Sequence, residues 1–309
     1  MIEARGLSKR YGEKLAVDQL TFTVRPGKVT GFLGPNGAGK STTMRMIMGL
    51  DAPTAGSVTV NGKRYAEHAR PLAEVGGLLE AKAVHTSRSA HNHLRALAAT
   101  HGISGRRVDD VVDMVGLHDV ARKRAGGFSL GMGQRLGIAS ALLGDPATVI
   151  LDEPVNGLDP EGVRWVRDLL RGLAAEGRTV FLSSHLMSEM ALTADHVIVV
   201  GRGQLIADMA IEDLIRTSSP NQVRVRTPHA ARLRDVLAGP DVTVTSGEVD
   251  VLDVHGLAAE RIGQLAFDNG IVLYELTAQK ASLEEAYMDM TRDSVEYHAS
   301  APATIGSAS

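Results

Sequence analysis

Hydrophobic and polar positions alternate, or run apolar for a few residues, through much of the first 80 positions, which is typical of β-strands. This pattern predicts strands at residues 2–7, 20–24, 29–33, 57–60 and 75–79. Residues 41–48 instead place apolar side chains at helical spacing and stop before Gly49, as a helix C-terminus does. The chain therefore opens in β-structure, with one helix following the third strand after a short glycine-rich loop.

The pattern changes twice further along the chain. Residues 85–143 have mainly helical spacing, which predicts a helical insert. Short apolar strands then return at 148–151, 179–183 and 197–200, with a helix predicted at 161–175. Strands that alternate with helices are typical of βαβ units, so we expect a parallel sheet in an α/β fold.

A cluster of turn-forming residues, SSPNQ at 218–222, predicts a linker at 218–221 and a second domain at 222–293. In that domain we expect strand, helix, two strands, helix, a strand at 271–276 and a last helix. This order predicts a small ferredoxin-like α+β sandwich. Residues 294–309 are small and polar with no apolar face to bury, which predicts a disordered tail.

Composition removes several classes of function. Thirty-three Lys and Arg against 36 Asp and Glu give a formal net charge of -3, so no overall positive field favours nucleic acid. The absence of cysteine excludes disulfides, a thiol nucleophile and cysteine metal sites, and suits the reducing cytosol. Since no apolar run reaches the roughly 18 to 20 residues that span a bilayer, we expect no membrane span.

The loop GPNGAGKST at 34–42 satisfies the phosphate-loop pattern, with Gly34, Gly39, Lys40 and Ser41 in the required places. It follows a strand and opens a helix, as the mechanism requires. Its backbone amides and the positive end of the helix dipole would hold phosphate groups, while Lys40 reaches the β- and γ-phosphates and Ser41 offers its hydroxyl to Mg2+. The alternative is a glycine-rich turn that only caps a helix. The predicted nucleotide-binding residues of the loop are Gly34, Pro35, Asn36, Gly37, Ala38, Gly39, Lys40, Ser41 and Thr42.

Two adjacent carboxylates follow the apolar strand at 148–151. Ligands of open α/β sheets bind at the carboxyl edge, where this strand delivers Asp152 and Glu153. Asp152 is placed to orient Mg2+ through its water, and Glu153 to act as the general base for an attacking water. Taken alone, the sequence LDEP would more often be a strand end with solvated acids. Together with the phosphate loop it predicts nucleotide hydrolysis.

The order GPNGAGKST, FSLGMGQR (128–135), ILDEP (150–154) and SSH (183–185) resembles the ATPase cassette of ABC (ATP-binding cassette) transporters over residues 1–217. The stretch aligned with the family's LSGGQ signature departs from it, because leucine replaces the first glycine and methionine the glutamine. The resemblance implies that Ser129 and Gly131 contact the γ-phosphate of ATP bound to a second subunit. Taken alone, this stretch is a helix start capped by Ser129.

The resemblance also assigns roles to four isolated residues. Asp159 falls in the loop that couples the two active sites of a cassette dimer, and His185 is the switch histidine that reaches the γ-phosphate. Tyr11 resembles the aromatic residue that stacks on adenine, although a lone tyrosine beside a strand is more often packing. Glu80 stands where the family usually has a glutamine near Mg2+, as in a subset of bacterial exporter cassettes.

The implied function is that of an ATP-hydrolysing subunit with the cofactors ATP and Mg2+. Two cassettes would face each other as a homodimer and drive a separate transmembrane permease that docks around the Glu80 region. The subunit would be cytoplasmic and peripheral on the inner face of the membrane. Glu80 and the SLGM signature resemble exporters of drug-like or antibiotic molecules. Lipid or other cargo, a non-transport cassette and a regulator without ATPase activity are the alternatives.

Overall fold

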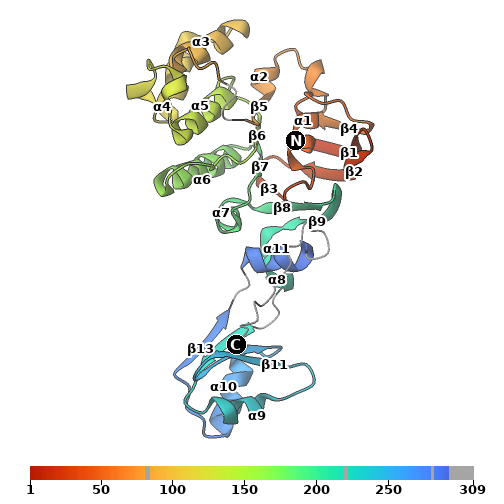
Figure 1. The fold of residues 1–309 in the computed structure, drawn as a ribbon, viewed down its shortest axis with the longest axis vertical. Coiled ribbons are helices and arrows are strands. Elements are labelled where there is room, and N and C mark those ends of the chain that lie inside the picture. The colour runs from red at the N-terminus through yellow and green to blue at the C-terminus, as the bar shows by residue number, and fades with distance from the viewer. Residues whose placement is uncertain (81–83, 219–221, 280–281, 292–309) are drawn as a thin grey trace, which may run out of the picture. The chain divides into compact units, whose positions relative to one another are not determined.

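The computed structural model describes residues 1–80, 84–218, 222–279 and 282–291 (Figure 1). These fall into two compact units, Met1–Met209 with Thr291, and Ala210–Met290. The sequence placed the linker at 218–221, but Ser218 is the last residue of helix α8 (Ile211–Ser218). Residues 219–221 and the tail at 294–309 lie outside the described residues, so those two expectations stay predictions.

A three-stranded antiparallel sheet begins the first unit. Its order is β2 (Lys14–Val24), β1 (Ile2–Tyr11) and β4 (Ala55–Val60). Ile2 pairs with Val24 on one side and with Val60 on the other. All three side chains are buried, so this register turns one face of the sheet toward the core.

A six-stranded sheet carries the rest of the first unit. Its order is β5 (Val75–Leu78), β6 (Thr148–Leu151), β7 (Thr179–Ser183), β3 (Val29–Leu33), β8 (His196–Gly201) and β9 (Gln204–Ala210). The neighbours from β5 to β8 pair in parallel, as the βαβ pattern predicted. Parallel strands end at the same edge, so the loops after β3 and β6 meet there although over 100 residues separate them in sequence.

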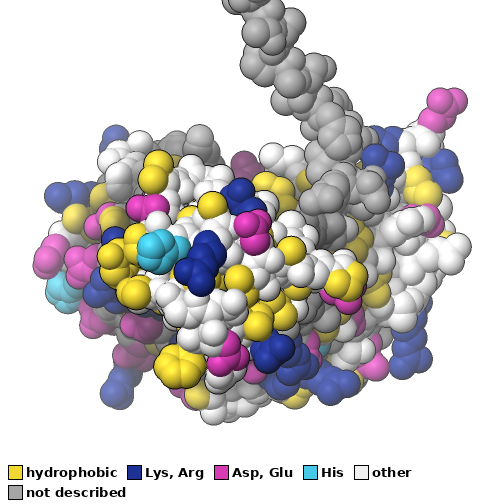
Figure 2. All heavy atoms as spheres, turned by 90° about the horizontal axis from the view of Figure 1, so that it is seen from below, with side chains coloured by type: hydrophobic (Ala, Val, Ile, Leu, Met, Phe, Trp, Pro, Cys, Tyr) yellow, Lys and Arg dark blue, Asp and Glu magenta, His cyan; other side chains and the backbone are white. Residues whose placement is uncertain are grey.

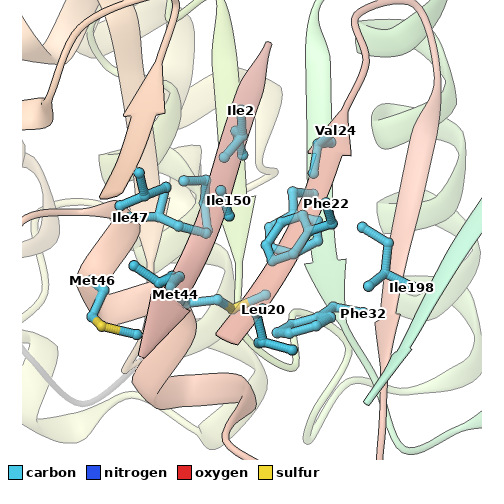
Figure 3. Packing of buried hydrophobic residues seen from close by; sticks show 14 of the residues in the cluster. Ile2, Leu20, Phe22, Val24, Phe32, Met44, Met46, Ile47, Ile150 and Ile198 are labelled. Atoms are coloured by element: carbon cyan, nitrogen blue, oxygen red, sulfur yellow. The ribbon is translucent and has the colours of Figure 1, made fainter. Parts of the chain in front are cut away.

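The core of this unit lies where β1 and β2, the six-stranded sheet and helix α1 (Lys40–Ile47) pack together (Figure 3). Phe22 from β2 and Phe32 and Phe181 from the central strands form an aromatic cluster, with ring centroids 5.1 to 6.0 Å apart. From α1, Met44 and Ile47 enter the same cluster. This packing fixes α1 at the edge of the sheet where the phosphate loop ends.

Helices supply the remainder of the first unit. The predicted helical insert contains α3 (Ala90–Thr100), α4 (Gly105–Met114) and α5 (Leu130–Leu142), each capped by the hydroxyl of a serine: Ser89, Ser104 and Ser129. The other helices are α2 (Pro71–Glu74), α6 (Pro160–Ala175) and α7 (Met187–Thr193). None of the helices in the described residues has the length and hydropathy of a transmembrane segment.

The second unit contains β10 (Gln222–Arg226), α9 (Ala230–Leu237), β11 (Thr243–Glu248), β12 (Val251–His255), α10 (Ala259–Asp268), β13 (Glu275–Gln279) and α11 (Leu283–Thr291). The sheet order is β11-β12-β10-β13, and every pair is antiparallel. The expected β-α-β-β-α-β order is present, while the ferredoxin-like classification stays a prediction.

The last strand of this sheet was misplaced. The apolar run at 271–276 predicted it, but β13 begins only at Glu275, because Ile271 packs into the core from the loop after α10.

Basic and acidic side chains are interspersed over the molecular face shown in Figure 2, with hydrophobic side chains between them. Among the coloured residues of that face, no continuous field of one charge sign is present.

Candidate active site

The phosphate loop joins the carboxyl end of β3 to the first turn of α1, as the sequence predicted. Glycine is required at two positions of this loop, because the backbone of another segment passes close to each of them. A methyl group on Gly34 would lie 2.4 Å from the Val200 carbonyl oxygen, and one on Gly39 would lie 2.5 Å from that of Ala16. Gly39 also has φ +98°, a backbone conformation that other residues rarely adopt. The loop is therefore fixed against β8 and β2.

Lys40 lies at the start of α1, with its ammonium folded back over the loop. It donates hydrogen bonds to the carbonyl oxygens of Gly34 (2.6 Å) and Pro35 (3.1 Å). Burial lowers the pKa of the Lys40 amine, and the nearby Glu153 and Asp152 carboxylates act in the opposite direction. The acid pair thus favours the charged form of the lysine within the partly buried loop.

Asp152 is held between two hydroxyl groups. The Ser41 hydroxyl donates to Oδ2 of Asp152 at 2.7 Å, and the Ser183 hydroxyl donates to Oδ1. Ser41 and Asp152 are separated by 111 positions, and the shared sheet edge brings them together. A hydroxyl and a carboxylate are the hard oxygen ligands that Mg2+ prefers, so the residues fit this ion.

Glu153 is fixed on three sides. Its N–H donates to the Ser183 hydroxyl (3.0 Å), and its carbonyl accepts from Nε2 of Gln134 (3.0 Å). Its carboxylate lies 2.7 Å from Nδ1 of His185 and accepts a longer bond from the His185 backbone N–H (3.3 Å). The φ of Glu153 is 51°, uncommon for a residue other than glycine. Contacts from α5, β7 and the loop after β7 stabilise this conformation.

Gln134 and Ser183 contact the acid pair, and the sequence identified neither as a site residue. Gln134 lies in α5, is only 3% exposed, and connects that helix to the Glu153 backbone. Gln134 lies within the FSLGMGQR stretch that the sequence singled out. The carbonyl that accepts its hydrogen bond, that of Glu153, lies 19 positions away, and no local pattern indicates this contact.

The phosphate loop and the acid pair line one cleft of about 440 Å³. The lining residues are Tyr11, Lys14, Ala16, Asn36, Gly37, Ala38, Gly39, Lys40, Ser41, Thr42, Asp152 and Glu153. Tyr11 stands at this cleft with 47% of its surface exposed, and its hydroxyl donates to Asp51 at 2.9 Å. An exposed ring beside the loop is available for stacking.

Seven predicted residues do not line this cleft. Gly34 and Pro35 belong to the phosphate loop itself and His185 contacts Glu153, whereas the other four are Ser129, Gly131, Asp159 and Glu80. Ser129 caps α5 by accepting from the Met132 N–H (3.2 Å), and a methyl group on Gly131 would lie 3.0 Å from the Gly157 carbonyl oxygen. Asp159 caps α6 by accepting from Gly162 N–H at 2.9 Å. Glu80 follows β5 and is exposed. The cleft of one chain is therefore lined without these four residues.

Comparison with known proteins gives two family matches. Residues 17–156 match the ABC transporter family, and this range includes the phosphate loop, the signature stretch and the acid pair. Residues 221–284 match a domain of unknown function, DUF8746, which covers most of the second unit.

Individual relatives extend the likeness over nearly the whole chain. An uncharacterized ABC transporter ATP-binding protein of Bacillus subtilis, YhcH, is 36% identical over 96% of this chain and 97% of its own length. The bacitracin transport ATP-binding protein BcrA of Bacillus licheniformis is 34% identical over 94% of this chain and 97% of its own. A solved ATP-binding subunit of an ABC transporter is 28% identical, with a TM-score of 0.64 over 70% of this chain and 92% of that one.

Proposed function

The chain belongs to the ATP-binding proteins of ABC transporters, and from this premise we propose that its cleft binds and hydrolyses ATP to drive a separate transmembrane permease that exports an antibiotic-like molecule. The observation that carries the proposal is one cleft lined by the phosphate loop and both acids, with Tyr11 at the same cleft. The permease would hold the subunit at the inner face of the membrane.

Each group in the cleft has a separate task. The loop amides and Lys40 bind the terminal phosphates, and Tyr11 stacks on the adenine. Ser41 and Asp152 would hold Mg2+, which neutralises phosphate charge when it is bound. Glu153 accepts the proton of the attacking water, and His185, hydrogen-bonded to that carboxylate, reaches the γ-phosphate. Glu80 is proposed to adjust the charge near the metal from outside the cleft lining.

The same arrangement supports a homodimer. Ser129 and Gly131 do not line the cleft of their own chain, and Ser129 begins a helix whose amides favour anions. In a head-to-tail pair, these two residues of one subunit would complete the phosphate site of the other. Asp159, at the start of α6, would lie on the coupling loop between the two sites. Hydrolysis would then open the pair and move the permease helices.

We propose Gln134 as a positioning residue for Glu153. Gln134→Leu removes one buried hydrogen bond of about 1 to 1.5 kcal/mol, and is therefore expected to lower kcat roughly 5- to 10-fold. The KM for ATP should change little, because the phosphate loop is untouched. Steady-state ATPase kinetics separate the two constants. If kcat is unchanged and kcat/KM falls only because KM rises, the positioning role is contradicted.

The cargo is inferred from relatives. BcrA, a relative that matches this chain over nearly its full length, is named a bacitracin transport protein, and we propose a cyclic or modified peptide antibiotic as the cargo class here. The test co-expresses the chain with a candidate polytopic permease in a bacitracin-sensitive bacterium.

We expect the pair to raise the concentration of bacitracin that stops growth. The pair carrying Glu153→Gln, and the permease alone, should leave that concentration unchanged. If the wild-type pair gives no protection against peptide antibiotics while the purified chain still hydrolyses ATP, the cargo assignment is wrong and the ATPase assignment stands.

A further inference from the structure

A second hollow lies in the first unit, at the opposite edge of the sheet from the nucleotide cleft. Its volume is about 400 Å³, and it shares no lining residue with that cleft. Thr30 and His196 lie near the amino ends of β3 and β8, whereas the phosphate loop follows the carboxyl end of β3. The hollow is lined by Thr21, Phe22, Thr23, Arg25, Lys28, Thr30, His196 and Asp208.

Two cations, Arg25 and Lys28, line this hollow. Arg25 and Lys28 flank the turn between β2 and β3, and among the described residues neither side chain makes a hydrogen bond or an ion pair. The one carboxylate in the lining, Asp208, lies 2.6 Å from Nε2 of His196 and is engaged there. The lining of the hollow therefore carries two positive side chains against one carboxylate, an excess of positive charge.

A threonine, Thr30, also lines the hollow. Thr30 is 2% exposed and pairs in register with His196. In the described part of the chain, its hydroxyl has no hydrogen-bond partner. Because Thr30 lines the hollow, its hydroxyl can donate to a ligand there. The neighbouring Asp195 carboxylate accepts the Val29 N–H at 2.8 Å.

We propose that this hollow, the Thr30 pocket, binds the phosphate group of a phosphorylated small molecule or a phospholipid headgroup. The guanidinium of Arg25 and the ammonium of Lys28 are the two donors most used for phosphate, and Thr30 adds a neutral donor. A phosphate monoester carries about -1.5 to -2 charges at neutral pH, and the two cations of the lining outnumber its one carboxylate. This site is separate from the nucleotide cleft and does not depend on its proposed chemistry.

The test first fills the nucleotide cleft with Mg2+ and a non-hydrolysable ATP analogue, so that phosphate cannot bind the phosphate loop. Inorganic phosphate and glycerol phosphate are then titrated by calorimetry. We expect Arg25→Ala and Lys28→Ala each to weaken binding by about 10- to 100-fold, as loss of one hydrogen bond to a charged group does. The exposed pair Arg5→Ala and Lys63→Ala is the matched control and should leave the affinity unchanged.

Thr30→Val tests the Thr30 hydroxyl without removing charge. Valine has nearly the same shape and suits a strand, so the fold should be retained. We expect a roughly 5- to 10-fold weaker affinity for phosphate from the lost hydrogen bond, with unchanged ATP binding. Unaltered phosphate affinity in this variant and in the two charge variants would overturn the proposal.

Sedimentation with phosphatidic acid vesicles, with phosphatidylcholine vesicles as control, distinguishes the two sources of phosphate. Binding of vesicles but not of soluble phosphates, lost in Arg25→Ala, identifies a lipid headgroup. Binding of soluble phosphates, lost in the same variant, identifies a small molecule. Absence of both kinds of binding, or binding that the variants do not change, rejects the site.

Discussion

Glu153→Gln is expected to lower ATP turnover by about 10²- to 10⁴-fold, the usual contribution of a general base. The amide keeps the size of the side chain and can still contact His185, but it cannot accept the proton of the attacking water. ATP binding should be retained, since the phosphate loop, Ser41 and Asp152 are unchanged. With hydrolysis blocked, ATP-bound dimers should accumulate.

The measurements are phosphate release for turnover and size-exclusion chromatography with light scattering for the dimer. Glu260→Gln is the matched control, because Glu260 is exposed in α10 of the second unit and should change neither quantity. A Glu153→Gln protein that hydrolyses ATP at the normal rate would exclude Glu153 as the base. A slow variant that stays monomeric with ATP would contradict the proposed dimer instead.

The local parts of this site were predictable because their signals lie close together in sequence. The phosphate loop, the strand before it and the helix after it occupy one stretch, and the helix was placed within one residue of its observed bounds. The acid pair follows a buried strand that was assigned with its observed bounds. Such short segments carry their own pattern of burial and turn residues.

The contacts that complete the site were not predictable in the same way. The hydrogen bonds that hold Asp152 and Glu153 come from Ser41, Gln134 and Ser183, which are between 19 and 111 positions away. They depend on the strand order, in which β3 lies between β7 and β8, and no local pattern gives that order. Strand β9 and helix α7 were missed because both are partly exposed and weakly periodic. The Thr30 pocket likewise needs β2, β3, β8 and β9 together.

Lys40→Ala is expected to weaken ATP binding by about 30- to 4000-fold, since loss of one partner of a buried charged contact costs about 2 to 5 kcal/mol. Lys40 is the loop's one full positive charge toward the β- and γ-phosphates, and its two carbonyl contacts show that its ammonium lies over the loop. Turnover should fall with binding. Alanine suits the first turn of a helix, so α1 should persist.

Fluorescent ATP titration measures the affinity, and thermal unfolding checks the fold. Lys63→Ala removes an exposed lysine elsewhere in the first unit and should leave ATP affinity unchanged. The comparison with Glu153→Gln separates the two halves of the site, because one variant loses the nucleotide and the other keeps it without hydrolysis. If Lys40→Ala binds ATP as tightly as the unaltered chain, the nucleotide is not held by this loop, and the roles proposed for Ser41, Asp152 and Glu153 lose their geometric basis.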